Sequence, residues 1–132
     1  IETKEDLENR VVCTQNSSSA LQAIENEGAK ERFKDGDIVL FDTYTEAFLD
    51  LEAGRVDVVV ADEVLAKYYI AERGAEKFKI VDGDFGDEEY GVGVRKRDTT
   101  LLENLNKALD EMKADGKAAE ISEKWFGDNI VK

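Results

Sequence analysis

The chain has 132 residues, and its 31 acidic and 18 basic side chains give a formal net charge of −13. So acidic a surface repels phosphate backbones and anionic lipid headgroups, which argues against binding to nucleic acids or membrane surfaces. The chain has no histidine, which excludes Ser-His and Cys-His nucleophile pairs and zinc sites that use histidine. It has one cysteine, Cys13, which excludes an intrachain disulfide and zinc sites made of cysteines. We therefore expect no enzyme, no metal and no cofactor.

The first half of the chain is predicted to alternate strands with helices. Residues 11–14 and 38–41 are short apolar runs bounded by polar turns, and continuous runs of this kind are typical of buried strands in parallel sheets. A helix is predicted after each strand, because apolar residues recur there at helical spacing. The predicted buried residues of these helices are Leu21, Ile24, Phe33, Tyr44, Phe48 and Leu51.

The second half repeats this alternation and ends in two helices. Residues 56–61 form the most strongly β-prone run, and residues 78–81 and 91–94 are predicted as the fourth and fifth strands. A helix begins at Asp62, and the acidic run at 82–89 is expected to be a solvated loop. The predicted apolar stripes of the last two helices are Leu102, Leu105, Leu109 and Met112, then Ile121 and Trp125.

Strands that alternate with helices predict an α/β fold, here a three-layer sandwich with a mainly parallel, five-stranded, flavodoxin-like sheet. In such sheets, ligands bind outside the carboxyl ends of the strands. Two segments meet this condition, namely the turn at 16–19 after the first strand and Asp62 after the third. We therefore expect both to lie at one mouth.

The serines of the turn are candidates for anion binding. Ser17, Ser18 and Ser19 stand at the start of a helix, where backbone N–H groups lack partners and the helix dipole favours a negative charge. The alternative is that a serine simply caps the helix. Asp62 would supply the opposite charge, so the pair suits a zwitterion such as a free amino acid, unless Asp62 only caps its own helix.

A phosphoacceptor receiver domain is the main rival for a strand-end aspartate in a chain of this size. Its chemistry requires Mg²⁺ held by acidic residues beside the first strand. Here residues 14–17 read Thr-Gln-Asn-Ser, with no acid. The sequence therefore argues against that function, although not against that fold.

Several segments together resemble the bacterial extracellular solute-binding proteins of the polar amino-acid type, which feed ABC importers. The resemblance is carried by the order and spacing of seven segments over almost the whole chain. These are residues 5–7, 11–19, 51–63 (with Ala53-Gly54-Arg55-Val56-Asp57), 89–96 (Glu-Tyr-Gly-Val-Gly-Val-Arg-Lys), 105–109, 115–116 and 125–127 (Trp-Phe-Gly).

The resemblance implies two α/β lobes joined by crossover strands, with an amino acid held between them. Residues 1–88 would form the second lobe, and residues 89–132 would supply a crossover strand and helices that complete the first. By motif position, Ser18 and Ser19 match residues that bind the ligand carboxylate, and Asp62 matches the acid that pairs with its ammonium group. Gln15 lies where the family often contacts the ligand side chain. Ser17 replaces the usual glycine of the turn.

The family also implies partners and a location. The partners would be a free polar amino acid and the membrane subunits of an ABC importer. The location would be periplasmic or extracellular, with a cell-surface lipoprotein as one form, although the chain does not open on a signal peptide.

The length departs from the family pattern, because such proteins are about twice as long and the missing part belongs to the first lobe. Half a cleft encloses a ligand poorly, so we expect weak or no binding by this chain alone. The stripe at 102–112 must then dock on the chain's own sheet, exchange with a second copy or remain exposed, and exposure is the least expected. The alternative function is a compact or domain-swapped scaffold that binds no ligand.

Overall fold

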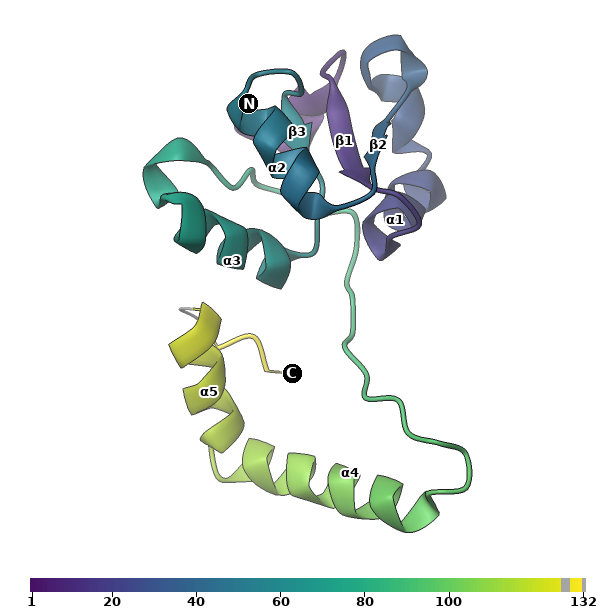
Figure 1. Cartoon of the computed structure of the whole chain (residues 1–132), viewed down its shortest axis with the longest axis vertical. Coiled ribbons are helices and arrows are strands. Elements are labelled where there is room, and N and C mark those ends of the chain that lie inside the picture. The colour runs from purple at the N-terminus through teal and green to yellow at the C-terminus, as the bar shows by residue number, and fades with distance from the viewer. Residues whose placement is uncertain (127–128, 132) are drawn as a thin grey trace. The chain divides into compact units, whose positions relative to one another are not determined.

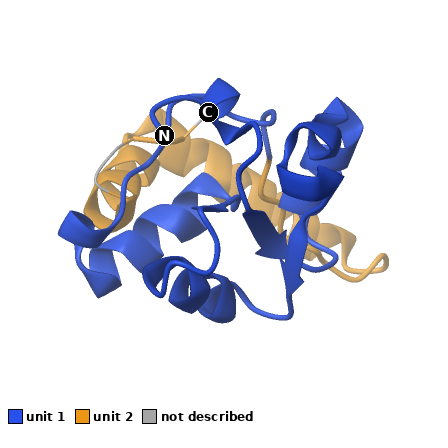
Figure 2. Cartoon of the chain, turned by 90° about the horizontal axis from the view of Figure 1, so that it is seen from above, with its two compact units in different colours: residues 1–88 blue, residues 89–132 orange. Residues whose placement is uncertain are grey.

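The computed structural model describes residues 1–126 and 129–131 and divides into two compact units, Ile1–Glu88 and Glu89–Lys132 (Figure 2). We call them unit 1 and unit 2. Gly127, the last residue of the Trp-Phe-Gly motif, lies outside the described residues. The candidate site residues all belong to unit 1.

The sheet of unit 1 is parallel, with β1 (Val12–Gln15) between β2 (Val39–Phe41) and β3 (Val58–Val59) (Figure 1). The register places Cys13 beside Val39 on one side and beside Val59 on the other. The first three predicted strands and their parallel arrangement are therefore confirmed. The predicted burial of the second strand is wrong in part, because β2 lies at the edge of the sheet and its Val39 and Leu40 expose 40% and 46% of their surface.

Helices cover both faces of this sheet. Val12 packs in a buried cluster with Ile24 of α1 (Ser19–Glu27), and the next residue, Cys13, packs in a second cluster with Ala47 of α2 (Tyr44–Glu52). Successive side chains of a strand point to opposite faces, so α1 and α2 lie on opposite sides of the sheet (Figure 1). The three-layer α/β prediction is confirmed. Four of the predicted core residues are buried, namely Ile24, Phe33, Tyr44 and Phe48.

The rest of unit 1 consists of one long helix and short 3-10 turns. Helix α3 spans Glu63–Arg73, and its Tyr69 stacks on Phe48 of α2 with ring centroids 4.8 Å apart. Phe78 meets the same Phe48 edge-on at 5.7 Å. The 3-10 turns are η1 (Lys4–Leu7), η2 (Ala29–Arg32), η3 (Lys34–Gly36) and η4 (Ala75–Lys77).

Within the described residues the sheet has three strands, so the prediction of five was too high. Residues 78–81 belong to no strand, and next to them Asp82 forms a single bridge with Thr3. Residues 91–94 are also outside any strand, in a unit whose other described elements are helices. A strand exists only where a neighbour accepts and donates its backbone hydrogen bonds, and the apolar pattern alone does not supply one.

Unit 2 contains α4 (Thr99–Ala114) and α5 (Lys117–Phe126), which meet at an angle around Gly116 (Figure 1). No residue of α4 is buried, and Leu102 and Leu109 expose 41% and 40% of their surface. The expectation that the chain's own sheet or a second copy covers this stripe stays a prediction. None of the helices among the described residues combines the length and hydrophobicity that crossing a lipid bilayer requires.

Candidate functional site

The carboxyl ends of the three strands meet at one edge of the sheet. Because β1 is parallel to both neighbours, the segments that follow the strands leave in the same direction. Hydrogen bonds connect them, since Asn16 N–H donates to the Phe41 carbonyl at 2.8 Å and Val60 N–H donates to the Cys13 carbonyl at 2.9 Å. The serine turn and Asp62 thus follow adjacent strands at a common edge, as predicted.

Ser18 is the N-cap of α1. Its hydroxyl oxygen accepts a hydrogen bond from Leu21 N–H at 3.1 Å, and its proton is donated to the Gln15 carbonyl at 2.7 Å. The capping alternative is therefore correct for this hydroxyl. The N–H groups of Ser19 and Ala20, in the first turn of α1, remain the donors that an anion would meet.

The neighbouring residues of the turn are more exposed than Ser18. Ser17 has a φ of 55°, which is the left-handed region that favours glycine, so the turn keeps a glycine-like backbone without a glycine. Ser19 donates its hydroxyl proton to Oε1 of Glu88 at 2.8 Å. Gln15 donates from Nε2 to the Asp42 carbonyl at 2.9 Å, which holds its side chain along the strand ends.

Asp62 is the N-cap of α3 and lies half-buried at the same edge. Its Oδ1 atom accepts a hydrogen bond from Leu65 N–H at 2.8 Å. In the part of the chain that the structure describes, Oδ2 accepts no hydrogen bond and forms no ion pair. One oxygen of the carboxylate therefore caps the helix while the other faces no partner, so capping does not prevent Asp62 from pairing with an ammonium group.

Thr14 links the serine turn to the segment that precedes Asp62. The sequence pattern did not single it out as a site residue. It is fully buried, and its hydroxyl donates to the Val60 carbonyl at 2.8 Å and lies 3.4 Å from the Ser18 oxygen. Thr14 thereby connects the end of β1 to the segment that leads into Asp62. A polar side chain inside an apolar strand was the available signal.

Glu88 was also missed. It is the last but one residue of the acidic run that the sequence predicted to be a solvated loop, and the run is indeed mostly exposed. The hydrogen bond to Ser19 nevertheless places a carboxylate beside the N-terminus of α1. A run of acidic residues does not indicate which of them will form a hydrogen bond with a distant residue.

Two hollows of unit 1 lie away from this edge. One, of about 140 Å³, is lined by residues that include Lys4, Leu7 and Phe33, and the other, of about 420 Å³, is lined by Leu51, Glu52, Lys77 and Phe78. Neither contains a predicted site residue. The described residues also contain no cluster of three or more acidic or cysteine side chains arranged to hold a metal ion.

Comparison with known proteins decides the family. The sequence profile of the bacterial extracellular solute-binding proteins, family 3, matches residues 8–128. The chain belongs to this family. Among curated solute-binding proteins, the ABC transporter arginine-binding protein 1 of Escherichia coli is 36% identical over 91 residues, which cover 67% of the chain and 37% of that protein. The ABC transporter glutamine-binding protein of Bacillus subtilis is 30% identical over 101 residues, covering 76% of the chain and 36% of that protein.

Solved structures of solute-binding proteins share the fold. A substrate-binding protein of an ABC uptake transporter from Streptococcus pneumoniae, with bound histidine, superimposes with a TM-score of 0.80 at 32% identity. An ancestral arginine-binding protein bound to glutamine gives a TM-score of 0.73 at 41% identity. The alignments cover 100% and 97% of the chain but only 55% of each of those proteins. The chain thus spans about half the length of solved members of its family, and less than half of the two curated relatives.

Proposed function

We propose that this chain is the amino-acid-binding lobe of a solute-binding protein that serves an ABC importer outside the cytoplasmic membrane, and that it has no catalytic activity. The observation that carries the proposal is the common edge, where the first turn of α1 and the half-paired carboxylate of Asp62 follow adjacent strands. These groups have opposite polarity, which matches the two charged ends of a free amino acid. Family membership supports the same assignment.

In this proposal each site residue has a defined role. The first turn of α1, with Ser18 and Ser19, binds the ligand carboxylate, and Asp62 binds its ammonium group. Gln15 contacts the ligand side chain, and Ser17 shapes the turn. Free polar amino acids are the expected ligands, as the names of the relatives state for those proteins.

We also propose that the chain represents one lobe and part of another. Residues 1–88 would be the second lobe, and residues 89–132 would provide a crossover strand and helices that complete a first lobe. The division into two compact units at Glu88 and Glu89 supports this boundary, and so does the half-length match to relatives. Without an enclosing lobe, we expect dissociation constants in the millimolar range, because enclosure supplies much of the affinity of a small-ligand site.

Nuclear magnetic resonance titration of the ¹⁵N-labelled chain tests the proposal. We expect L-arginine, L-glutamine or L-histidine to shift the amide signals of residues 15–20 and 60–63 at millimolar concentration. Blocking either end of the ligand, as an amide or an N-acetyl derivative, should abolish the shifts, because each end has its own partner at the edge.

The Asp62→Asn variant is the matched control for the ammonium contact, because asparagine caps a helix about as well as aspartate but carries no charge. We expect it to remain folded and to lose at least about tenfold in affinity. No shift at either segment with any of the three amino acids would contradict the proposed function. Micromolar binding in calorimetry would contradict the half-site interpretation.

A second candidate function is self-association, either as a scaffold or as a swapped dimer. The observation in its favour is the exposure of large apolar side chains on both helices of unit 2, where Leu101 and Trp125 expose 54% and 67% of their surface. Monomeric proteins seldom leave such side chains in a contiguous patch. This candidate is compatible with the first, because a partner lobe and a second copy would compete for the same surface.

A further inference from the structure

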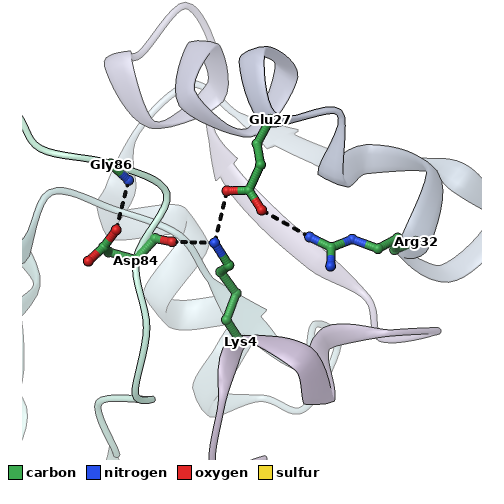
Figure 3. A network of polar contacts seen from close by, with 5 residues as sticks. All are labelled: Lys4, Glu27, Arg32, Asp84 and Gly86. Atoms are coloured by element: carbon green, nitrogen blue, oxygen red, sulfur yellow. Dashed lines mark hydrogen bonds and ion pairs between the residues drawn. The ribbon is translucent and has the colours of Figure 1, made fainter.

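The segment 82–88, which we call the strap, is tied to the start of the chain. Thr3 pairs with Asp82, and Lys4 N–H donates to the Asp82 carbonyl at 2.9 Å. Lys4 also reaches the strap with its side chain, since Nζ donates to the Asp84 carbonyl at 2.6 Å (Figure 3). These contacts fix the first part of the strap against unit 1.

The same lysine links the strap to α1. Its Nζ lies 2.9 Å from a carboxylate oxygen of Glu27, the last residue of α1, and Glu27 in turn accepts a hydrogen bond from Arg32 at 3.1 Å (Figure 3). Phe85 of the strap lies under the Lys4 ammonium group, 4.9 Å from it, and packs against the buried cluster that contains Ile24 of α1. The strap is therefore held by both polar and apolar contacts before it reaches Glu88.

Glu88 ends the strap at the opposite end of α1. Its Oε1 atom accepts the hydroxyl proton of Ser19, the first residue of that helix, at 2.8 Å. Helices commonly carry an acidic residue in their first turn, where the dipole stabilises it, but α1 has none of its own. A carboxylate that is 69 positions away in the sequence supplies the missing charge.

We propose that Glu88 is an internal competitor of the ligand carboxylate, an inference that rests on the proposed function. An amino acid binding through Ser19 and the first turn of α1 must displace the Glu88 side chain or accept its repulsion. The contact with Ser19 thus lowers the affinity of the edge for amino acids.

The test compares Glu88→Gln with Glu89→Gln in the full chain. Both substitutions remove one negative charge at neighbouring positions, so they change the general field equally. Without ligand, we expect Glu88→Gln to shift the Ser19 and Ala20 amide signals, and Glu89→Gln to leave them in place. With L-glutamine as the probe, we expect Glu88→Gln to bind about 2- to 10-fold more tightly than the natural chain, and Glu89→Gln to bind as the natural chain does.

The outcomes separate this inference from the proposed function. Equal affinity in all three proteins, or weaker binding by Glu88→Gln, would overturn the competitor role and leave the amino-acid site intact. The competitor role would also be overturned if Glu88→Gln did not shift the Ser19 amide signal in the unliganded chain. Absence of binding by every variant, including Glu88→Ala, would overturn the proposed function and this inference with it.

Discussion

Cys13 lies in the centre of β1, fully buried against Ala47 and Val56. Burial raises the pKa of its thiol from an ordinary value of 9.0 to about 12, and the Asp50 carboxylate adds to the rise. Both effects disfavour the thiolate. Cys13 therefore behaves as a small apolar core residue.

This shift predicts a specific loss of stability in alkali. Between the two pKa values, the thiol keeps its proton in the folded chain and loses it in the unfolded chain. The unfolded state then binds fewer protons, so the free energy of unfolding falls as the pH rises from about 9 towards 12. Below pH 9 this contribution is constant. Urea unfolding at pH 8 and pH 10 measures the difference.

Cys13→Ala provides the comparison, because it removes the thiol and keeps every other side chain. We expect the natural chain to lose more stability between the two pH values than the variant does. A parallel loss in both proteins would contradict the assigned role of the thiol. Alkylation with iodoacetamide gives a second check, since the buried thiol should react only when the chain opens.

Other residues show where sequence reasoning reached its limit. The sequence correctly placed Ser18 and Asp62 at the starts of helices that follow strands, because strand ends and helix starts are visible in the pattern. The contacts of Thr14 with Val60 and of Ser19 with Glu88 were not predictable, since each joins positions that are 46 or 69 residues apart. Such pairs depend on the register of the sheet and the path of a loop, which no local spacing encodes.

At the scale of elements, the two helices at the site begin in the same way. Ser18 and Asp62 each end a connection from a strand, and each accepts a hydrogen bond from the N–H three residues later. A cap of this kind satisfies one of the free donors of the first turn and fixes where the helix starts. The positions of the proposed ligand-binding groups therefore depend on the caps.

Asp62 allows the capping contribution to be measured apart from charge. We expect Asp62→Ala to lower the free energy of unfolding by about 1 kcal/mol, because Leu65 N–H loses its acceptor. Asp62→Asn should stay close to the natural chain, since the amide oxygen accepts the same bond. Urea unfolding of the three proteins at one pH gives both numbers. If asparagine proved as damaging as alanine, the charge rather than the cap would be the stabilising feature.

Strands were predicted well where an apolar run also has a neighbouring strand to pair with. Residues 11–14, 38–41 and 56–61 are apolar runs, and each includes residues that pair with another strand. Residues 78–81 and 91–94 have the pattern but no ladder in the described structure. Phe78 packs edge-on against Phe48 instead, whereas Ile80 exposes 53% of its surface, so the apolar pattern of this run predicted neither its hydrogen bonding nor its burial.

The two units of the molecule differ in how many side chains they bury. Unit 1 buries apolar side chains on both faces of its sheet. Unit 2 buries Ser122 in α5 but no residue of α4, so its apolar stripe has little to pack against. About half of each aligned relative lies outside the chain's match, and a complete partner lobe would offer the surface that this stripe lacks.

The exposed stripe predicts concentration-dependent association of the isolated chain. We expect sedimentation equilibrium to give a mass that rises above the monomer value of 14.8 kDa as concentration increases, and salt to promote the effect by screening the net charge of −13. The double variant Leu102→Glu and Leu109→Glu should remain monomeric, because it places charges in the apolar face.

Lys107→Glu is the matched control, since it changes the net charge by the same two units from an exposed position beside Glu111. Helical spacing places it away from Leu102 and Leu109. We expect it to associate as the natural chain does. A natural chain that stays monomeric at every concentration would show that unit 2 covers its own stripe in solution. Association that is equally weakened by Lys107→Glu would point to general charge repulsion and against a contact through α4.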